Sequence, residues 1–195
     1  MLMALATLGS AWSSYQASLW NGIQTFLLSD ASRLSREAHE KAMMASQQRS
    51  LDAALFVQFA RDYYSGKTDF AQFFLERSRP ELREAIKAWV ATKPAKDPNA
   101  PTTPFAMPEY KVPAEAQDVD LSAQSSTAHD KAQKANLTSD TYSLLGVLFT
   151  ASLFLAGLVS GIDDRKARQV LLILSISAMV LAATVIVRLP LAHRG

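Results

Sequence analysis

The fold of this chain is decided by two stretches, residues 141–162 (TYSLLGVLFTASLFLAGLVSGI) and residues 169–187 (QVLLILSISAMVLAATVIV). The first contains no ionisable side chain except Tyr142, and the second contains none. Each run has about the twenty residues that a helix rising ~1.5 Å per residue needs to cross ~30 Å of hydrocarbon. We therefore predict two transmembrane helices over residues 141–191, joined as a hairpin by the charged loop DDRKAR at residues 163–168.

A third apolar segment opens the chain and continues into the polar stretch AWSSYQASLWNGIQ, residues 11–24. The tryptophans and the tyrosine in this stretch are typical of a membrane interface, so we predict a short first span over residues 1–28. Residues 1–11 imitate the apolar part of a signal peptide but lack its basic beginning, so we expect them to be retained.

Two patterns run along this first helix. Apolar residues recur every three or four positions from Leu5 to Phe26, which places them on one stripe that faces something apolar. Small residues recur every fourth position from Ala6 to Gly22, which favours close packing of another helix. Polar side chains are costly in lipid, so we expect them to pack between helices or to line a pore. The predicted packing or pore-lining residues, including the GLVSG glycines of the hairpin, are Ser10, Ser14, Gln16, Ser18, Asn21, Gly22, Gln24, Gly157 and Gly161.

Residues 29–140 form the polar part of the chain. No proline or glycine interrupts residues 29–64, so we predict a long helix that continues the first span. Two short aromatic helices follow, near residues 69–76 and from Pro80 onward, and a polar helix is expected over residues 114–135. The predicted fold is all-α, with about three transmembrane helices, a long antiparallel helical stalk and a small helical cap whose core is aromatic.

Six of the eight prolines lie in residues 93–113, KPAKDPNAPTTPFAMPEYKVP. This spacing excludes a long helix and favours an extended strap over the surface of the cap. Phe105, Met107 and Tyr110 are too apolar to leave in water, so we expect them to pin the strap to the helices or to bind a partner protein.

The residues offer little chemistry. Cysteine is absent, which excludes disulfides and thiolate sites, and the three histidines are isolated from one another in the sequence. No nucleotide-binding, hydrolase or zinc-protease motif is present. Residues 29–140 carry fifteen Lys and Arg against sixteen Asp and Glu, a balance that excludes a nucleic-acid-binding face. We therefore expect no enzyme activity, cofactor, metal or small-molecule substrate.

Three motifs carry a family resemblance: WSSYQASLW, RSRPELREAIKAWVATKP with NAPTTPFAMPEY, and the C-terminal hairpin. Together they resemble an uncharacterised family of small bacterial membrane proteins with a W-S-x-Y-Q-A motif after the first span and a PFAMPEY-like segment. The resemblance covers nearly the whole chain and implies a bacterial inner-membrane protein. It implies no activity and no catalytic residue.

The basic hairpin loop predicts the side of the membrane on which the polar region lies. Arg165, Lys166 and Arg168 favour a cytoplasmic loop, which would place residues 29–140 in the periplasm, although basic residues also flank the spans on the other side. We expect a membrane-anchored scaffold or accessory subunit that contacts lipid and either forms a homo-oligomer or joins a larger membrane complex. The alternative is a homo-oligomeric channel lined by the first helix.

Overall fold

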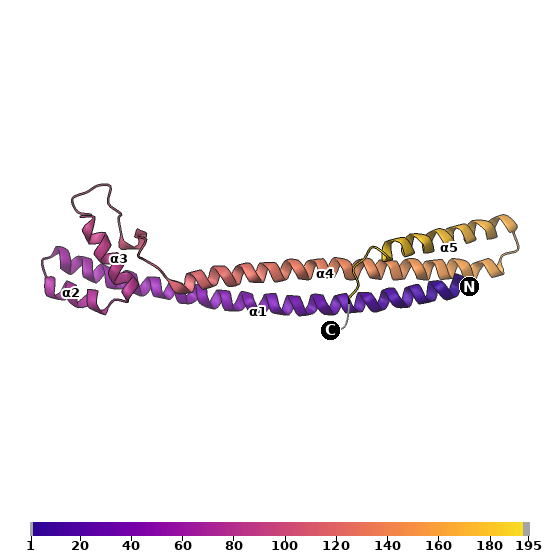
Figure 1. Cartoon of the computed structure of the whole chain (residues 1–195), viewed down its shortest axis with the longest axis horizontal. Helices are drawn as coiled ribbons and strands as arrows, with labels where there is room; N and C mark the ends of the chain where they lie inside the picture. The colour runs from indigo at the N-terminus through magenta and orange to yellow at the C-terminus, as the bar shows by residue number, and fades with distance from the viewer. Residues whose placement is uncertain (1, 193–195) are drawn as a thin grey trace. The chain divides into compact units, whose positions relative to one another are not determined.

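The structure is a computed structural model that describes residues 2–192. Every regular element in that range is helical and no strand occurs in it, which confirms the predicted all-α class (Figure 1). The elements are α1 (Leu2–Tyr64), α2 (Thr68–Arg77), α3 (Pro80–Ala91), the 3-10 turn η1 (Pro104–Ala106), α4 (Pro113–Leu158), the 3-10 turn η2 (Val159–Gly161) and α5 (Arg165–Ile186).

Two helices are much longer than the rest. The 63 residues of α1 form one unbroken helix, as predicted from the lack of breakers after Ser29, and it ends before Gly66, whose φ of +75° suits glycine. Helix α4 begins with Pro113 and has Glu115 in its first turn, which favour a helix start because of their fixed φ and the helix dipole. Asp164 caps α5 by accepting a hydrogen bond from the backbone N–H of Lys166.

The chain divides into two compact units. Unit 1 comprises residues 1–32 and 125–195, of which residues 2–32 and 125–192 are described, and unit 2 comprises residues 33–124. The predicted boundaries at residues 28 and 140 followed hydropathy. The units follow packing instead, so the C-terminal part of the polar helix belongs with the membrane-type helices.

In unit 1, α1 and α4 lie side by side and antiparallel (Figure 1). Ser139 Oγ donates to the carbonyl of Ala17 and Ser125 Oγ to that of Ala31, both at 2.9 Å. Ala17 and Ala31 are fourteen residues apart, as are Ser125 and Ser139, so the same contact recurs after two heptads on both helices. This repeat is the signature of coiled-coil packing.

The packed seam uses small side chains, which lets the two backbones approach closely. On α1 the buried residues include Ala6, Ser13 and Ala17, and a Cβ added at Gly9 would lie 2.7 Å from the Phe149 ring of α4. Helices α4 and α5 meet in the same way. Ser152 and Ser175 are fully buried, and each hydroxyl donates to the other residue's carbonyl at 2.8 Å.

In unit 2, the C-terminal part of α1 packs with α2 and α3 around a core of Phe59, Ala71, Leu82 and Ile86. The proline-rich segment lies against this core. Trp89 Nε1 donates to the carbonyl of Pro101 at 2.7 Å, and the Phe105 ring lies edge-on to Phe56 at 5.6 Å. The predicted docking of the strap is therefore confirmed.

Candidate functional site

The strap of unit 2 is held by a buried carboxylate on α1. Asp52 is only 1% exposed, and its oxygens accept three hydrogen bonds: from Gln48 Nε2 at 3.0 Å, Arg79 Nε at 2.9 Å and Tyr110 Oη at 2.9 Å. An isolated charge is costly to bury, and these donors supply its compensation. We call this group, Gln48, Asp52, Arg79 and Tyr110, the strap clamp because Tyr110 belongs to the strap.

Arg79 connects the strap clamp to a second carboxylate. Besides Asp52 it pairs with Glu81 at 3.1 Å, and its guanidinium lies 5.2 Å from the centre of the Tyr110 ring. Burial and then the hydrogen bond to Asp52 raise the pKa of Tyr110 above its usual value. A tyrosine that stays neutral and an arginine that stays charged hold the carboxylate in place. This arrangement fixes a segment of chain, and it contains no paired base and nucleophile.

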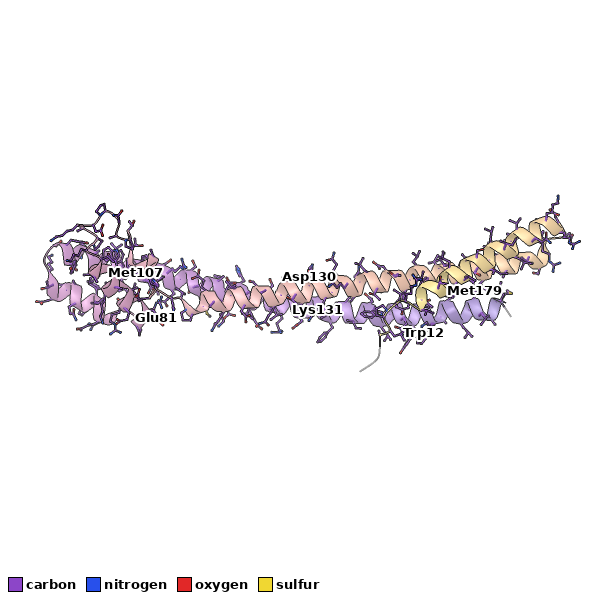
Figure 2. All side chains as sticks on the ribbon, turned by 45° about the horizontal axis from the view of Figure 1, so that its top comes forward. Trp12, Glu81, Met107, Asp130, Lys131 and Met179 are labelled. Carbon is purple, nitrogen blue, oxygen red and sulfur yellow. The ribbon has the colours of Figure 1, made fainter. Side chains whose placement is uncertain are left out.

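The predicted strap residues occupy inward positions. Phe105 and Tyr110 lie 5.0 Å apart at their ring centres and pack against the core, and Met107 is also half-buried (Figure 2). Their apolar surface is therefore largely used to hold the strap on its own chain.

A second clamp, in unit 1, holds the segment that follows α5. The side-chain amide of Gln16 pairs with the backbone of Ala192: Oε1 accepts from the Ala192 N–H at 2.9 Å and Nε2 donates to its carbonyl at 3.4 Å. Trp20 Nε1 and Tyr142 Oη each donate to the carbonyl of Pro190 at 3.2 Å. We call Gln16, Trp20 and Tyr142 the tail clamp. The sequence did not predict the tail clamp. The one signal for it was Gln16 itself, a polar residue within an apolar helix.

The predicted packing residues of α1 fall into two groups. Ser10 bonds Thr150 at 3.1 Å, Gln16 belongs to the tail clamp, and Gln24 is half-buried. Ser14, Ser18, Asn21 and Gly22 are exposed in the chain. The small residues that recur at every fourth position do not share one face of α1, because four residues turn an α-helix by about 40° more than a full circle.

The hairpin glycines lie apart from the contact between α4 and α5. A Cβ added at Gly157 would come no closer than 3.9 Å to Met3, on α1, and one added at Gly161 would meet no described atom within 4 Å. The close contact of the hairpin comes from Ser152 and Ser175 instead. The GLVSG stretch ends in the η2 turn, so its second glycine lies outside helix α4.

The apolar stripe of α1 faces away from α4. Leu5, Leu8, Trp12, Tyr15 and Phe26 are 45–72% exposed, and Figure 2 shows Trp12 on the surface of the helix. With half-buried Leu19 and exposed Gly22, these residues alternate spacings of three and four, which is a second heptad pattern on the same helix. We call this set, Leu5, Leu8, Trp12, Tyr15, Leu19, Gly22 and Phe26, the outer seam.

Unit 2 exposes aromatic side chains on α2 and at the end of α1. Phe70 is 62% exposed, Phe73 45% and Tyr64 54%, although the sequence predicted the phenylalanines of α2 in the core. The prediction was wrong for Phe70 and Phe73. Helix α2 turns Ala71, Phe74 and Leu75 toward the core. Phe70 and Phe73 are three positions apart, so they share a face of α2, and this face points away from the core. On the opposite face of α2 from Phe70 and Phe73 lies an open groove of about 300 Å³, lined by Phe59, Tyr63, Thr68, Ala71, Gln72, Leu75, Ile86, Lys87 and Val90. We call the exposed rings Tyr63, Tyr64, Phe70 and Phe73 the aromatic surface.

Residues 2–192 show no candidate metal site. They contain no group of three or more His, Cys, Asp or Glu side chains that could hold a metal ion.

No family model matches the chain, and neither a curated protein nor a solved structure is significantly similar to it. The resemblance to a family of small bacterial membrane proteins therefore stays a prediction.

Proposed function

We propose that this protein is a membrane-anchored helical scaffold or accessory subunit, in which unit 1 is the anchor and the aromatic surface of unit 2 binds a partner protein. The observation that carries the proposal is the inverted arrangement of unit 1. Its polar side chains Ser13, Gln16, Ser152 and Ser175 are at most 1% exposed, whereas many of its large apolar side chains, such as Leu8, Phe154 and Ile173, point outward. A helix of a water-soluble protein shows the opposite pattern.

Two helices of the described chain are long and apolar enough to span a membrane, α5 and the helix that contains α4. Only 11% of the apolar window of α5 and 28% of that in the α4 helix is buried. Ile173 and Phe154, for example, are 64% and 66% exposed. Lipid would cover these side chains, and the mutual hydrogen bonds of Ser152 and Ser175 keep two buried hydroxyls paired where no water is available.

The N-terminal part of α1 is not among those two helices. It packs on the apolar part of α4, since Ser10 bonds Thr150 and Gly9 lies against Phe149. A short third span over this part of α1, sheltered by α4, fits the exposed Leu5 and Leu8. We propose that the protein is multi-pass in the bacterial inner membrane, with unit 2 in the periplasm because the hairpin loop is basic.

The aromatic surface supports a protein partner. Exposed aromatic side chains are typical of binding hot spots, because large rigid rings bury much area at low entropic cost. Arg77 lies 3.8 Å from the centre of the Phe73 ring, which holds that ring in place on the surface. A protein partner would cover these rings.

The channel is supported less well than the scaffold. Of the candidate pore-lining side chains, Ser10 and Gln16 already bond within the chain. A pore would then have to be lined by Ser14, Ser18, Asn21 and Gln24, which are small or near the end of the apolar segment.

Two measurements test the proposal. Alkaline carbonate washing of membranes should leave the protein in the pellet, and its release would overturn the anchor. Phe70→Ser with Phe73→Ser should abolish co-purification of the partner in mild detergent, while Leu51→Ser, at an equally exposed position of unit 2, should keep it. Equal recovery from both variants would exclude the aromatic surface as the binding site.

A further inference from the structure

The outer seam continues beyond the part of α1 that the membrane helices accompany. The tail clamp fixes where the chain leaves α5: Ala192 bonds Gln16 and Pro190 bonds Trp20. Phe26 follows Trp20 by six residues, or about 9 Å along the helix at ~1.5 Å per residue. Lipid that covers α5 therefore does not extend to Phe26.

The neighbouring helix shows that Phe26 lies at the level of charged residues. Ser125 bonds Ala31, and in antiparallel helices five residues back on α1 correspond to five residues forward on α4, which is Asp130. Asp130 and Lys131 are exposed on α4 (Figure 2). Phe26 is nevertheless 72% exposed, so a large apolar side chain stands at the level of charged residues, where covering it with a second protein helix would be favourable.

Gly22 adds an independent observation. It lies inside α1, where glycine is less favourable than alanine, and a Cβ added to it would meet no described atom within 4 Å. Nothing within the described part of unit 1 requires a glycine there. A second helix that approaches closely at this point of the outer seam would require it.

We propose that the outer seam pairs with the outer seam of a second copy of this chain, as a parallel coiled coil along residues 5–26 of α1. This inference rests on the membrane anchoring proposed above, because anchored copies share one orientation and their identical seams then meet in register. No Asp, Glu, Lys, Arg or His occurs in residues 2–29, so two identical helices meet there without repulsion between like charges. The alternating spacing of three and four is the pattern that such a pair needs.

The chain has no cysteine, which makes single-cysteine cross-linking a clean test. We would introduce Leu19→Cys or Phe26→Cys into the full-length protein in native membranes and add a short bis-maleimide. A parallel pair places each residue opposite its own copy, so both variants should give a covalent dimer of twice the 21.3 kDa chain. Asn21→Cys, which is exposed on another face of the same turns, should give little dimer. Co-expression of two differently tagged copies should place both tags in the product.

Several results would overturn the inference. Equal dimer from Asn21→Cys, or no dimer from either seam variant, would show that the seam is not a self-association face. A cross-linked product of another mass would assign the seam to a different protein. As a second measurement, Phe26→Lys should shift the protein from dimer to monomer in native mass spectrometry, and Asn21→Lys should not. Carbonate washing separates the two proposals, because seam cross-links in a protein that washes off the membrane would refute the anchor and leave the seam intact.

Discussion

Removing one hydroxyl from the strap clamp should loosen the strap by a measurable amount. Tyr110→Phe keeps the ring, with its contacts to Phe105 at 5.0 Å and Arg79 at 5.2 Å, and deletes only the donor to Asp52. A hydrogen bond to a charged group contributes about 1.5–3 kcal/mol. Asp52 retains two other donors, Gln48 and Arg79, so we expect the lower end, about 1.5 kcal/mol.

The assay is limited proteolysis with a lysine-specific protease in mild detergent, followed at the bond after Lys111, beside the strap clamp. When opening is fast relative to cleavage, the cleavage rate follows the population of the open form. A loss of about 1.5 kcal/mol should therefore raise the rate about tenfold. Tyr63→Phe is the matched control, because Tyr63 is 41% exposed and lies outside the clamp. If Tyr110→Phe and Tyr63→Phe are both cut at the wild-type rate, the hydroxyl does not hold the strap and the reasoning fails.

The remaining predictions concern both units. Phe105→Ser with Tyr110→Ser removes two half-buried rings, each worth roughly 1.5–3 kcal/mol on full burial. The rate of cutting between residues 93 and 113 should therefore exceed that of Tyr110→Phe, while membrane insertion is unchanged. Equal cutting rates would mean that the rings do not help to hold the strap. Gln16→Leu leaves the Ala192 backbone without its partner, so amide hydrogens of residues 187–192 should exchange faster, whereas unchanged exchange would refute the tail clamp. Gly9→Val should destabilise unit 1 because its Cβ would meet Phe149 at 2.7 Å, and Gly22→Ala should leave the thermal midpoint of the monomer unchanged or raised. Because the pKa of Tyr110 is raised, its neutral hydroxyl stabilises the folded strap below the usual tyrosine pKa of about 10. This contribution is lost as the pH rises through the higher pKa of the folded protein. Cleavage after Lys111 should therefore accelerate in that pH range in the wild type and not in Tyr110→Phe. A periplasmic reporter inserted near Asn99 should be active, and activity of a cytoplasmic reporter alone would invert the topology.

The sequence by itself determined that the chain is helical and where most of its helices begin. Unbroken runs of helix-forming residues predicted α1 as one helix, Pro80 and Pro113 stand at the first positions of α3 and α4, and the proline-rich segment was excluded from long helices. These features follow from the backbone preferences of each residue and its near neighbours, which need no knowledge of the fold. The docking of Phe105 and Tyr110 was also predictable, since large rings in a polar segment require cover.

Only the tertiary structure decided which face of each helix is used. Two heptad patterns coexist on α1, and periodicity does not say which one meets α4 and which stays outward. For the same reason the sequence wrongly predicted that Phe70 and Phe73 are buried, because α2 is apolar on more than one side. The strap clamp joins Asp52 to residues 27 and 58 positions away, and the tail clamp joins Gln16 to Ala192 across 176 positions. Gln16 bonds backbone groups there, and since every peptide unit offers the same groups, no pattern of side chains could have identified its partner.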